Sequence, residues 1–331
     1  MKKIHAKSPC CDSDTYRFGE RRRQCKICKH TWRTRIKRKG RKKKRVSKSL
    51  VIQYLSHAVG SAYARSTSKQ VSARAMTRDI VRSRDLFCRT TPWPESPKTE
   101  ILIAIADAVI KRVARKQYTA YCILLRGSEQ TEATILEPTI LAGGETQEGW
   151  RQAFDVLPES VRSSTKAIVC DGHRGMVNYA KNQKWLIQRC QFHLIKAIQG
   201  RRSRFAQSRH QKEAKRIFDL VYKVLDQEDE KGILRILFKI EACALSTTSK
   251  ELRRVLLGFV NNYEDYRTYL YHPELCLPTT SNTAESFIGC VEELCHRLRG
   301  FPNVRSFSKW IEALAKFKKK VKCNGHFQPR K

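Results

Sequence analysis

Three acidic residues that are far apart in the chain are the side chains best suited to do chemistry. Asp107 and Asp171 each follow a run of apolar residues that is expected to form a buried strand, and Glu285 lies where a helix is expected to begin. A fold that brings these positions together presents a cluster of carboxylate oxygens, the ligands that hard divalent cations prefer. The net charge of the chain is +36, so a nucleic-acid phosphate is the expected anion for such cations to act on.

The first two acids also have a purely structural interpretation. Asp107 could cap a helix over residues 108–115, and Asp171 with Gly172 could simply turn the chain. An isolated buried carboxylate is driven to protonate, however, and two acids at the ends of neighbouring strands repel each other unless cations relieve the repulsion. The occurrence of both acids at strand ends therefore favours metal coordination.

The third acid is harder to assign. Glu285 follows Asn282 by three residues, a spacing that resembles a capping box at the start of a helix. Such a cap is compatible with a carboxylate that is directed at a metal from the first helical turn. Glu292 and Glu293 are rival ligands in the same predicted helix.

A Cys-x-x-His motif, Cys190 to His193, follows the second acid. Its side chains could order the helix that begins here, or His193 could contact a phosphate beside the site. A packed thiol next to a hydrogen-bonded imidazole is the structural alternative. The motif lacks the two further local ligands that would favour zinc.

Four cysteines near the start of the chain have the spacing of a small zinc-stabilised module. Cys25 and Cys28 form a regular C-x-x-C pair, which brings two thiolates to one tetrahedral Zn²⁺. The other pair, Cys10 and Cys11, is adjacent and therefore irregular. The sequence leaves open whether the fourth ligand is Cys10 or one of two histidines, His5 and His30. A basic tail with incidental thiols is the alternative.

The N-terminal region is strongly basic. Residues 1–48 contain 20 Lys and Arg against three acids, which predicts an arm that meets a polyanion. The segment 36–48, with Arg41, Lys42 and Lys43, is either a linker that lies along phosphates or a solvated charged run.

Residues 47–87 have the pattern of two helices joined by a polar turn, which predicts a helix-turn-helix. The second helix of such a motif lies in the major groove, so Arg74, Thr77 and Arg78 are the candidates for contact with DNA. An ordinary helical connector is the alternative. Near the C-terminus, Lys316 and its basic neighbours are expected to line the path of the DNA.

Composition limits the class of protein. The chain has 331 residues, of which 40% are hydrophobic, enough for two or three domains with a sizeable core. Its 13 cysteines are scattered through apolar segments, as expected for reduced thiols. No apolar run is long enough to span a membrane or to act as a signal peptide. We expect a cytoplasmic, nucleoid-associated protein that has no membrane partner.

The elements that must position the acids follow a recognisable order. A proline-rich segment over residues 91–97 marks the expected start of the main domain. Three strands, a helix, and then alternating strands and helices predict an RNase H-like α/β domain. The expected domains are a zinc ribbon, a basic linker with the helix-turn-helix, and a catalytic domain with a helical insertion at about 201–275; they span 1–40, 41–95 and 96–331. Strands are expected at 101–107, 118–125, 131–140, 166–170 and 185–188, and helices at 146–156, at 173–181 and from 191 onward.

The ordered set of motifs resembles a known family. The two aspartates, the Cys-x-x-His motif, and a Thr-Thr-Ser-Asn stretch before Glu285 are similar to those of the Mutator-like DDE transposases of bacterial insertion sequences, in their C-x-x-H subgroup. The resemblance covers roughly residues 99–315. The N-terminal zinc ribbon and helix-turn-helix resemble the modules that related transposases use to find the terminal repeats of their element.

This resemblance implies a two-metal mechanism. Asp107 would bridge two Mg²⁺ or Mn²⁺ ions, while Asp171 and Glu285 would each complete one site. The implied function is binding of the terminal inverted repeats, followed by DNA cleavage and strand transfer. The implied partners are the element ends, target DNA, and a second copy of the chain in a homodimer or larger assembly. The alternatives are a non-catalytic zinc and helix-turn-helix DNA-binding protein, and an RNase H-like nuclease that does not join strands.

Overall fold

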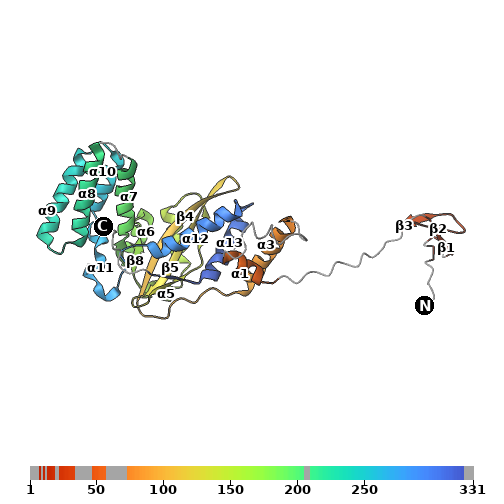
Figure 1. Ribbon diagram of the computed structural model, residues 1–331. Helices are drawn as coiled ribbons and strands as arrows, with labels where there is room; N and C mark the ends of the chain where they lie inside the picture. Colours follow the sequence, from red (N-terminus) through yellow and green to blue (C-terminus); the bar gives the residue numbers. More distant parts are fainter. Residues whose placement is uncertain are drawn as a thin grey trace. The chain divides into compact units, whose positions relative to one another are not determined.

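The computed structural model describes residues 7–8, 10–11, 13–18, 22–33, 47–56, 73–204 and 209–323. The chain divides into two compact units, residues 1–46 and 47–331 (Figure 1). The smaller unit contains a three-stranded antiparallel sheet in the order β1-β2-β3. These strands are Thr15–Arg17, Arg22–Cys25 and Thr31–Arg33. With so few residues, the unit has little apolar core of its own, and a metal is the usual means of stabilising such a module.

The larger unit is built on a mixed seven-stranded sheet. Its strand order is β10-β6-β5-β4-β8-β9, with β7 paired to β5. β4 runs antiparallel to β5 and parallel to β8, and β8 runs parallel to β9. The strands are β4 Leu102–Val113, β5 Lys116–Gly127, β6 Glu132–Ile135, β7 Thr139–Ala142, β8 Thr165–Cys170, β9 Leu186–Arg189 and β10 Lys320–Lys322.

Helices cover both faces of this sheet, because β4 buries side chains on both sides. Ile103 and Ile105 belong to one apolar core, whereas Leu102 and Ala104 belong to the other. The helices on the second side are α4 Gln147–Asp155, α5 Glu159–Ser164 and α6 Arg174–Asn182. Those on the first side are α12 Asn282–Leu298 and α13 Val304–Lys318, with α1 Ser49–Leu55 and α3 Ala73–Thr90 packed beyond them. By the alternation of a strand, Asp107 lies on the side of Ile103 and Ile105, which is the side of α12.

The strand β4 is longer than its sequence pattern predicts. It does not end at Asp107 but continues to Val113, so residues 108–113 form a strand and not the helix considered as the alternative. The reason is that β5 pairs with β4 along its whole length, and a tight turn at Ala114 and Arg115 joins the two strands, with φ of 46° and 69°. Asp107 is therefore held in the middle of a strand.

The expected strand at 131–140 is two strands. β6 ends at Ile135 and β7 begins at Thr139, and Pro138 stands between them, where it cannot donate to a ladder of hydrogen bonds.

The two N-terminal helices of the larger unit share a core with the rest of that unit, although the sequence predicts a boundary near residue 95. Buried residues of α3, Ile80, Phe87 and Cys88, share one core with Trp310 of α13. The Ser83 hydroxyl also joins α1 to α3, because it accepts a hydrogen bond from the Val51 amide at 3.0 Å. The apolar face of α3 is thus used for packing, which the spacing of its residues alone did not reveal.

A helical bundle follows β9, as the apolar spacing of this segment predicts. It consists of α7 Gln191–Arg204, α8 Arg209–Asp226, α9 Glu230–Ser246 and α10 Lys250–Val260. The four helices enclose a third apolar core and form one cluster in Figure 1. Three short turns then lead back to α12: η1 Glu264–Tyr266, α11 Thr268–Tyr271 and η2 Pro273–Leu275. In the described part of the chain, no helix is long and apolar enough to cross a membrane.

The packing of α1 and α3 on α13 predicts the effect of removing its central aromatic side chain. Trp310 is 3% exposed, lies 5.3 Å from the Tyr54 ring and carries the Arg84 guanidinium over its face at 5.2 Å. Trp310→Ala should lower the free energy of unfolding by about 3–5 kcal/mol in urea denaturation. The control Phe238→Ala, at a side chain that is 71% exposed, should change it by less than about 0.5 kcal/mol. Equal effects of the two substitutions would contradict this packing.

Candidate active site

Asp107 is a partly buried acid surrounded by other charges. Its Oδ1 accepts a hydrogen bond from the Ala108 amide at 2.8 Å. Burial raises the pKa of Asp107 to about 7; the Ala108 amide and His193 oppose this rise, and the negative charges of Asp171 and Glu285 add to it. The negative charges of Asp171 and Glu285 therefore both act on Asp107. The three acids are not among the groups of described residues whose ligand atoms all lie within 4.8 Å of one another.

Asp171 comes directly after β8, the parallel neighbour of β4. Ile105 of β4 is paired with Val169 of β8, so two further residues along each strand lead to Asp107 and Asp171. The chain then turns through Gly172, whose φ of +91° is a conformation that glycine adopts without strain. The turn lets Asp171 Oδ1 accept a hydrogen bond from the His173 amide at 2.8 Å, which fixes the carboxylate.

Glu285 lies in the first turn of α12, as the sequence predicts. Helix α12 starts at Asn282 with Ser281 as its N-cap, and no side chain caps it, so Asn282 and Glu285 do not form a capping box. Glu285 Oε1 lies 3.4 Å from the Ser281 hydroxyl and 3.4 Å from His193 Nδ1. The rival Glu292 instead pairs with Lys111 at 2.8 Å, in a contact between α12 and β4.

The Cys-x-x-His motif contacts the glutamate. Cys190 is fully buried, and its sulfur accepts a hydrogen bond from the Ser281 amide at 3.2 Å. Burial lowers the pKa of His193, but its interactions with Cys190 and the negative charges of Glu285 and Asp107 outweigh burial and raise that pKa to about 9. Ligand atoms of Cys190, His193 and Glu285 all lie within 4.8 Å of one another.

A fourth acid beside Asp171 has no counterpart in the sequence motifs. Glu145 Oε1 accepts a hydrogen bond from the Trp150 indole at 2.7 Å and lies 3.6 Å from His173 Nδ1. Burial raises the pKa of Glu145, and the charge of Asp171 contributes to the rise. The available signal was its place just before Thr146, which caps α4, but this position alone predicts only a loop.

The smaller unit brings its four cysteines together. The sulfurs of Cys10 and Cys28 are 2.9 Å apart and those of Cys11 and Cys25 are 3.2 Å apart, and all four lie within 4.8 Å of one another. Four sulfurs around a tetrahedral zinc are about 3.8 Å apart, so the cluster could bind zinc. Hydrogen bonds with Ser13 and Cys25 lower the pKa of Cys11 to about 6, which favours the thiolate that a metal requires. The irregular pair Cys10 and Cys11 thus supplies two sulfurs.

Among the described residues, His30 is not part of this sulfur cluster. His30 stacks against Trp32 at a centroid distance of 6.3 Å. His5 lies outside the described residues, as do Arg41, Lys42 and Lys43.

Two of the predicted DNA contacts are accessible. Thr77 and Arg78 are exposed on α3, on turns that precede its packed residues. Arg74 lies in α3, but its side chain is outside the described part of the chain. Lys316 cannot line a DNA path, because it is buried and its ammonium donates hydrogen bonds to the Cys88 carbonyl at 2.7 Å and to Glu312 at 2.8 Å.

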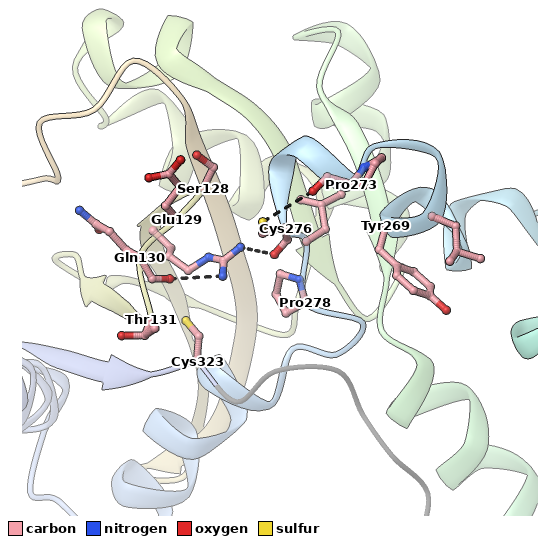
Figure 2. A pocket seen from close by; sticks show the side chains of 12 residues that line it. Ser128, Glu129, Gln130, Thr131, Tyr269, Pro273, Cys276, Pro278 and Cys323 are labelled. Carbon is pink, nitrogen blue, oxygen red and sulfur yellow. Dashed lines mark hydrogen bonds between the residues drawn. The ribbon is translucent and has the colours of Figure 1, made fainter.

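A cavity of about 570 Å³ lies beside the segment that leads into α12 (Figure 2). The Arg126 guanidinium crosses it and donates hydrogen bonds to the Cys276 carbonyl at 2.6 Å and to the Gln130 carbonyl at 3.3 Å. None of the three acids lines this cavity. Arg126 therefore acts as a clamp between the β5–β6 loop and the segment before Glu285.

The comparison with known protein families agrees with this arrangement. A family model described as "Transposase, Mutator family" matches residues 105–320, which include all three acids and the helical bundle. No curated protein matches the chain.

The charge cluster predicts how stability depends on pH. The pKa of Asp107 is about 7 in the folded chain, against about 3.9 in an unfolded one. Protonation of Asp107 therefore contributes to the free energy of unfolding in full below about pH 4, and this contribution is lost as the pH rises to about 7. Without metal, Asp107→Asn should raise the free energy of unfolding by up to about 4 kcal/mol at pH 8 and change it little at pH 4.

Chemical denaturation in EDTA at both pH values measures this difference. The control Glu95→Gln, at an acid with an 81% exposed side chain, should show no such dependence on pH. Added Mg²⁺ should stabilise the parent chain more than Asp107→Asn. If Asp107→Asn raised the free energy of unfolding equally at pH 4 and pH 8, the substitution would act through packing and not through charge.

Proposed function

We propose that this chain, which belongs to the Mutator family of transposases, is a DDE transposase that cleaves and joins DNA at Asp107, Asp171 and Glu285. The family implies a transposase that acts on DNA. The observation that carries the finer proposal is the raised pKa of Asp107, caused by its burial and by the charges of Asp171 and Glu285. Such a cluster is unfavourable without cations, and a divalent ion removes that cost.

The strand order supports an RNase H-like catalytic domain. Three antiparallel strands, β4 to β6, are followed by the parallel strands β8 and β9 on the other side of β4. In this arrangement β4 carries Asp107 and its parallel neighbour β8 leads into Asp171, while Glu285 comes from α12, which packs against β4. In sequence, the three acids are far apart, and the fold supplies their proximity.

The residues present suit two Mg²⁺ or Mn²⁺ ions. Bound there, the ions would supply an activated water or DNA 3′-hydroxyl and would stabilise the leaving oxygen during in-line attack. The charges of both Asp171 and Glu285 act on Asp107, so Asp107 is the residue suited to bind both ions. The His173 amide orients Asp171, and the Ser281 hydroxyl lies against Glu285, so each outer ligand has its own support.

The DNA-binding surfaces are proposed from charge and exposure. The net charge of +36 favours a phosphate backbone as partner. We assign recognition of the terminal inverted repeats to the smaller unit, stabilised by zinc at Cys10, Cys11, Cys25 and Cys28, and to Thr77 and Arg78 of α3. Joining two element ends requires that both be held together, so the active form is a dimer or larger assembly on DNA.

Two alternative functions make different predictions. A DNA-binding protein without catalysis has no use for a buried cluster of like charges, which the chain nevertheless maintains. An RNase H-like nuclease would use the same acids but would release cleaved ends without joining them. Strand joining is therefore the property to be measured.

The test is a strand-transfer assay with Mg²⁺, using labelled duplexes that carry the ends of the element and a supercoiled target plasmid. Asp107→Asn, Asp171→Asn and Glu285→Gln should each lower joining at least about 1,000-fold, which corresponds to about 4 kcal/mol. Fluorescence anisotropy should show that binding of the same duplexes is retained. Glu292→Gln, a glutamate of the same helix that is paired with Lys111, should remain active.

Each alternative has a distinct signature in this assay. If strand joining survived all three substitutions, the joining would come from a contaminating enzyme. This result would support the alternative of a DNA-binding protein without catalysis. Metal-dependent nicks that never become joined products would support the nuclease. Loss of activity in Glu292→Gln but not in Glu285→Gln would move the third ligand along α12.

A further inference from the structure

We propose that Cys190, His193 and Glu285 form a binding site for a borderline transition metal of the Zn²⁺ type, beside the oxygen-rich position formed by the two aspartates. The inference deepens the proposed function, on which it rests in taking Glu285 as an active-site acid. It adds a metal position that would share Glu285 with the proposed pair of Mg²⁺ or Mn²⁺ ions.

The spacing of the ligand atoms is that of a metal site. One atom from each of the three residues lies within 4.8 Å of the other two. At the usual zinc bond lengths, a nitrogen and an oxygen in tetrahedral geometry are about 3.4 Å apart. His193 Nδ1 and Glu285 Oε1 are 3.4 Å apart. The site therefore needs little rearrangement to close on an ion.

The ligands come from two helices whose starts are tied together. Cys190 precedes α7 and His193 lies in its first turn, so the three-residue spacing puts both on one face. Glu285 lies in the first turn of α12. The Gln191 amide donates a hydrogen bond to the Thr279 carbonyl at 2.9 Å, which holds the start of α7 against the segment before α12.

A backbone amide is directed at the sulfur of Cys190. The side chain is fully buried, and its sulfur accepts a hydrogen bond from the Ser281 amide at 3.2 Å. Metal ligands in proteins are oriented by such donors. The sulfur also lies near the N-termini of α7 and α12, where the helix dipoles favour negative charge.

The imidazole has a nitrogen ready for a ligand role. His193 Nδ1 is buried and makes no hydrogen bond within the described residues, although it lies near the Glu285 carboxylate. A buried ring nitrogen without a hydrogen bond carries a desolvation cost, and a metal bond removes it. A water would complete the fourth position of such an ion.

The donor set determines which ions the site prefers. Thiolate and imidazole ligands favour Zn²⁺ and Co²⁺, whereas Mg²⁺ requires oxygen ligands. Asp107 and Asp171 supply only oxygen, so the two sides of the cluster differ in selectivity. A packed thiol beside a hydrogen-bonded imidazole would show the same contacts without retaining any metal, and metal content distinguishes the two.

Zinc content of the full-length protein tests the proposal. After purification and removal of loosely bound metal, the parent chain should hold about two zinc ions, one in the sulfur cluster of the smaller unit and one at Cys190. Cys190→Ser and His193→Gln should each hold about one. A chain with both Cys25→Ser and Cys28→Ser should also hold about one, which would be lost when Cys190→Ser is added.

Cobalt binding provides a second measurement, which reports on the sulfur of Cys190. In the Cys25→Ser and Cys28→Ser background, Co²⁺ should produce a near-ultraviolet thiolate-to-cobalt absorption, and adding Cys190→Ser should abolish it. The control Cys243→Ser removes a thiol from α9 and should leave both the absorption and the zinc count unchanged. His193→Gln keeps the cysteine, so it tests the site even if Cys190→Ser fails to fold.

The outcomes separate this proposal from the proposed function. One zinc per parent chain, kept in Cys190→Ser and His193→Gln, would overturn the metal site, and so would a cobalt absorption that is unchanged by Cys190→Ser. Neither result would affect Mg²⁺-dependent strand transfer by the parent chain, which tests the transposase separately. Conversely, a second zinc in a chain that joins no strands would support the site and count against the function.

Discussion

The structure depends on the cost of placing several negative charges together in a partly buried position. Asp107 cannot ionise freely there, because burial and the charges of Asp171 and Glu285 oppose it. A chain that folds for stability alone would replace these acids with apolar or amide side chains. Divalent cations would supply opposite charge at this position, which is why we propose that these acids bind metal.

The surrounding elements can be understood as supports for these charges. The parallel pairing of β4 with β8 sets the two aspartates side by side, and the turn at Gly172 frees the amide that holds Asp171. Glu285 lies on α12, whose N-cap residue Ser281 donates a backbone hydrogen bond to the sulfur of Cys190, just before α7. Farther away, the Arg126 guanidinium holds the segment that leads into α12. Each acid thus has a separate structural support.

Much of this arrangement could be predicted from local patterns. The helix over residues 146–156 is confirmed because a threonine cap and apolar periodicity agree there. The sequence could not show that β4 continues past Asp107, since a partner strand decides where a strand ends. Lys316 lies in a basic stretch that predicts contact with DNA, yet tertiary packing buries its side chain. Contacts between distant segments, such as that of His193 with Glu285, leave no local signal.

The placement of the helical bundle has a mechanical consequence. The bundle begins with α7, whose first turn carries His193, and the chain returns from it to α12, whose first turn carries Glu285. The first turn of the bundle therefore meets the first turn of α12, where His193 Nδ1 lies 3.4 Å from Glu285 Oε1. A tilt of α7 relative to α12 would therefore change the distance between this imidazole and this carboxylate.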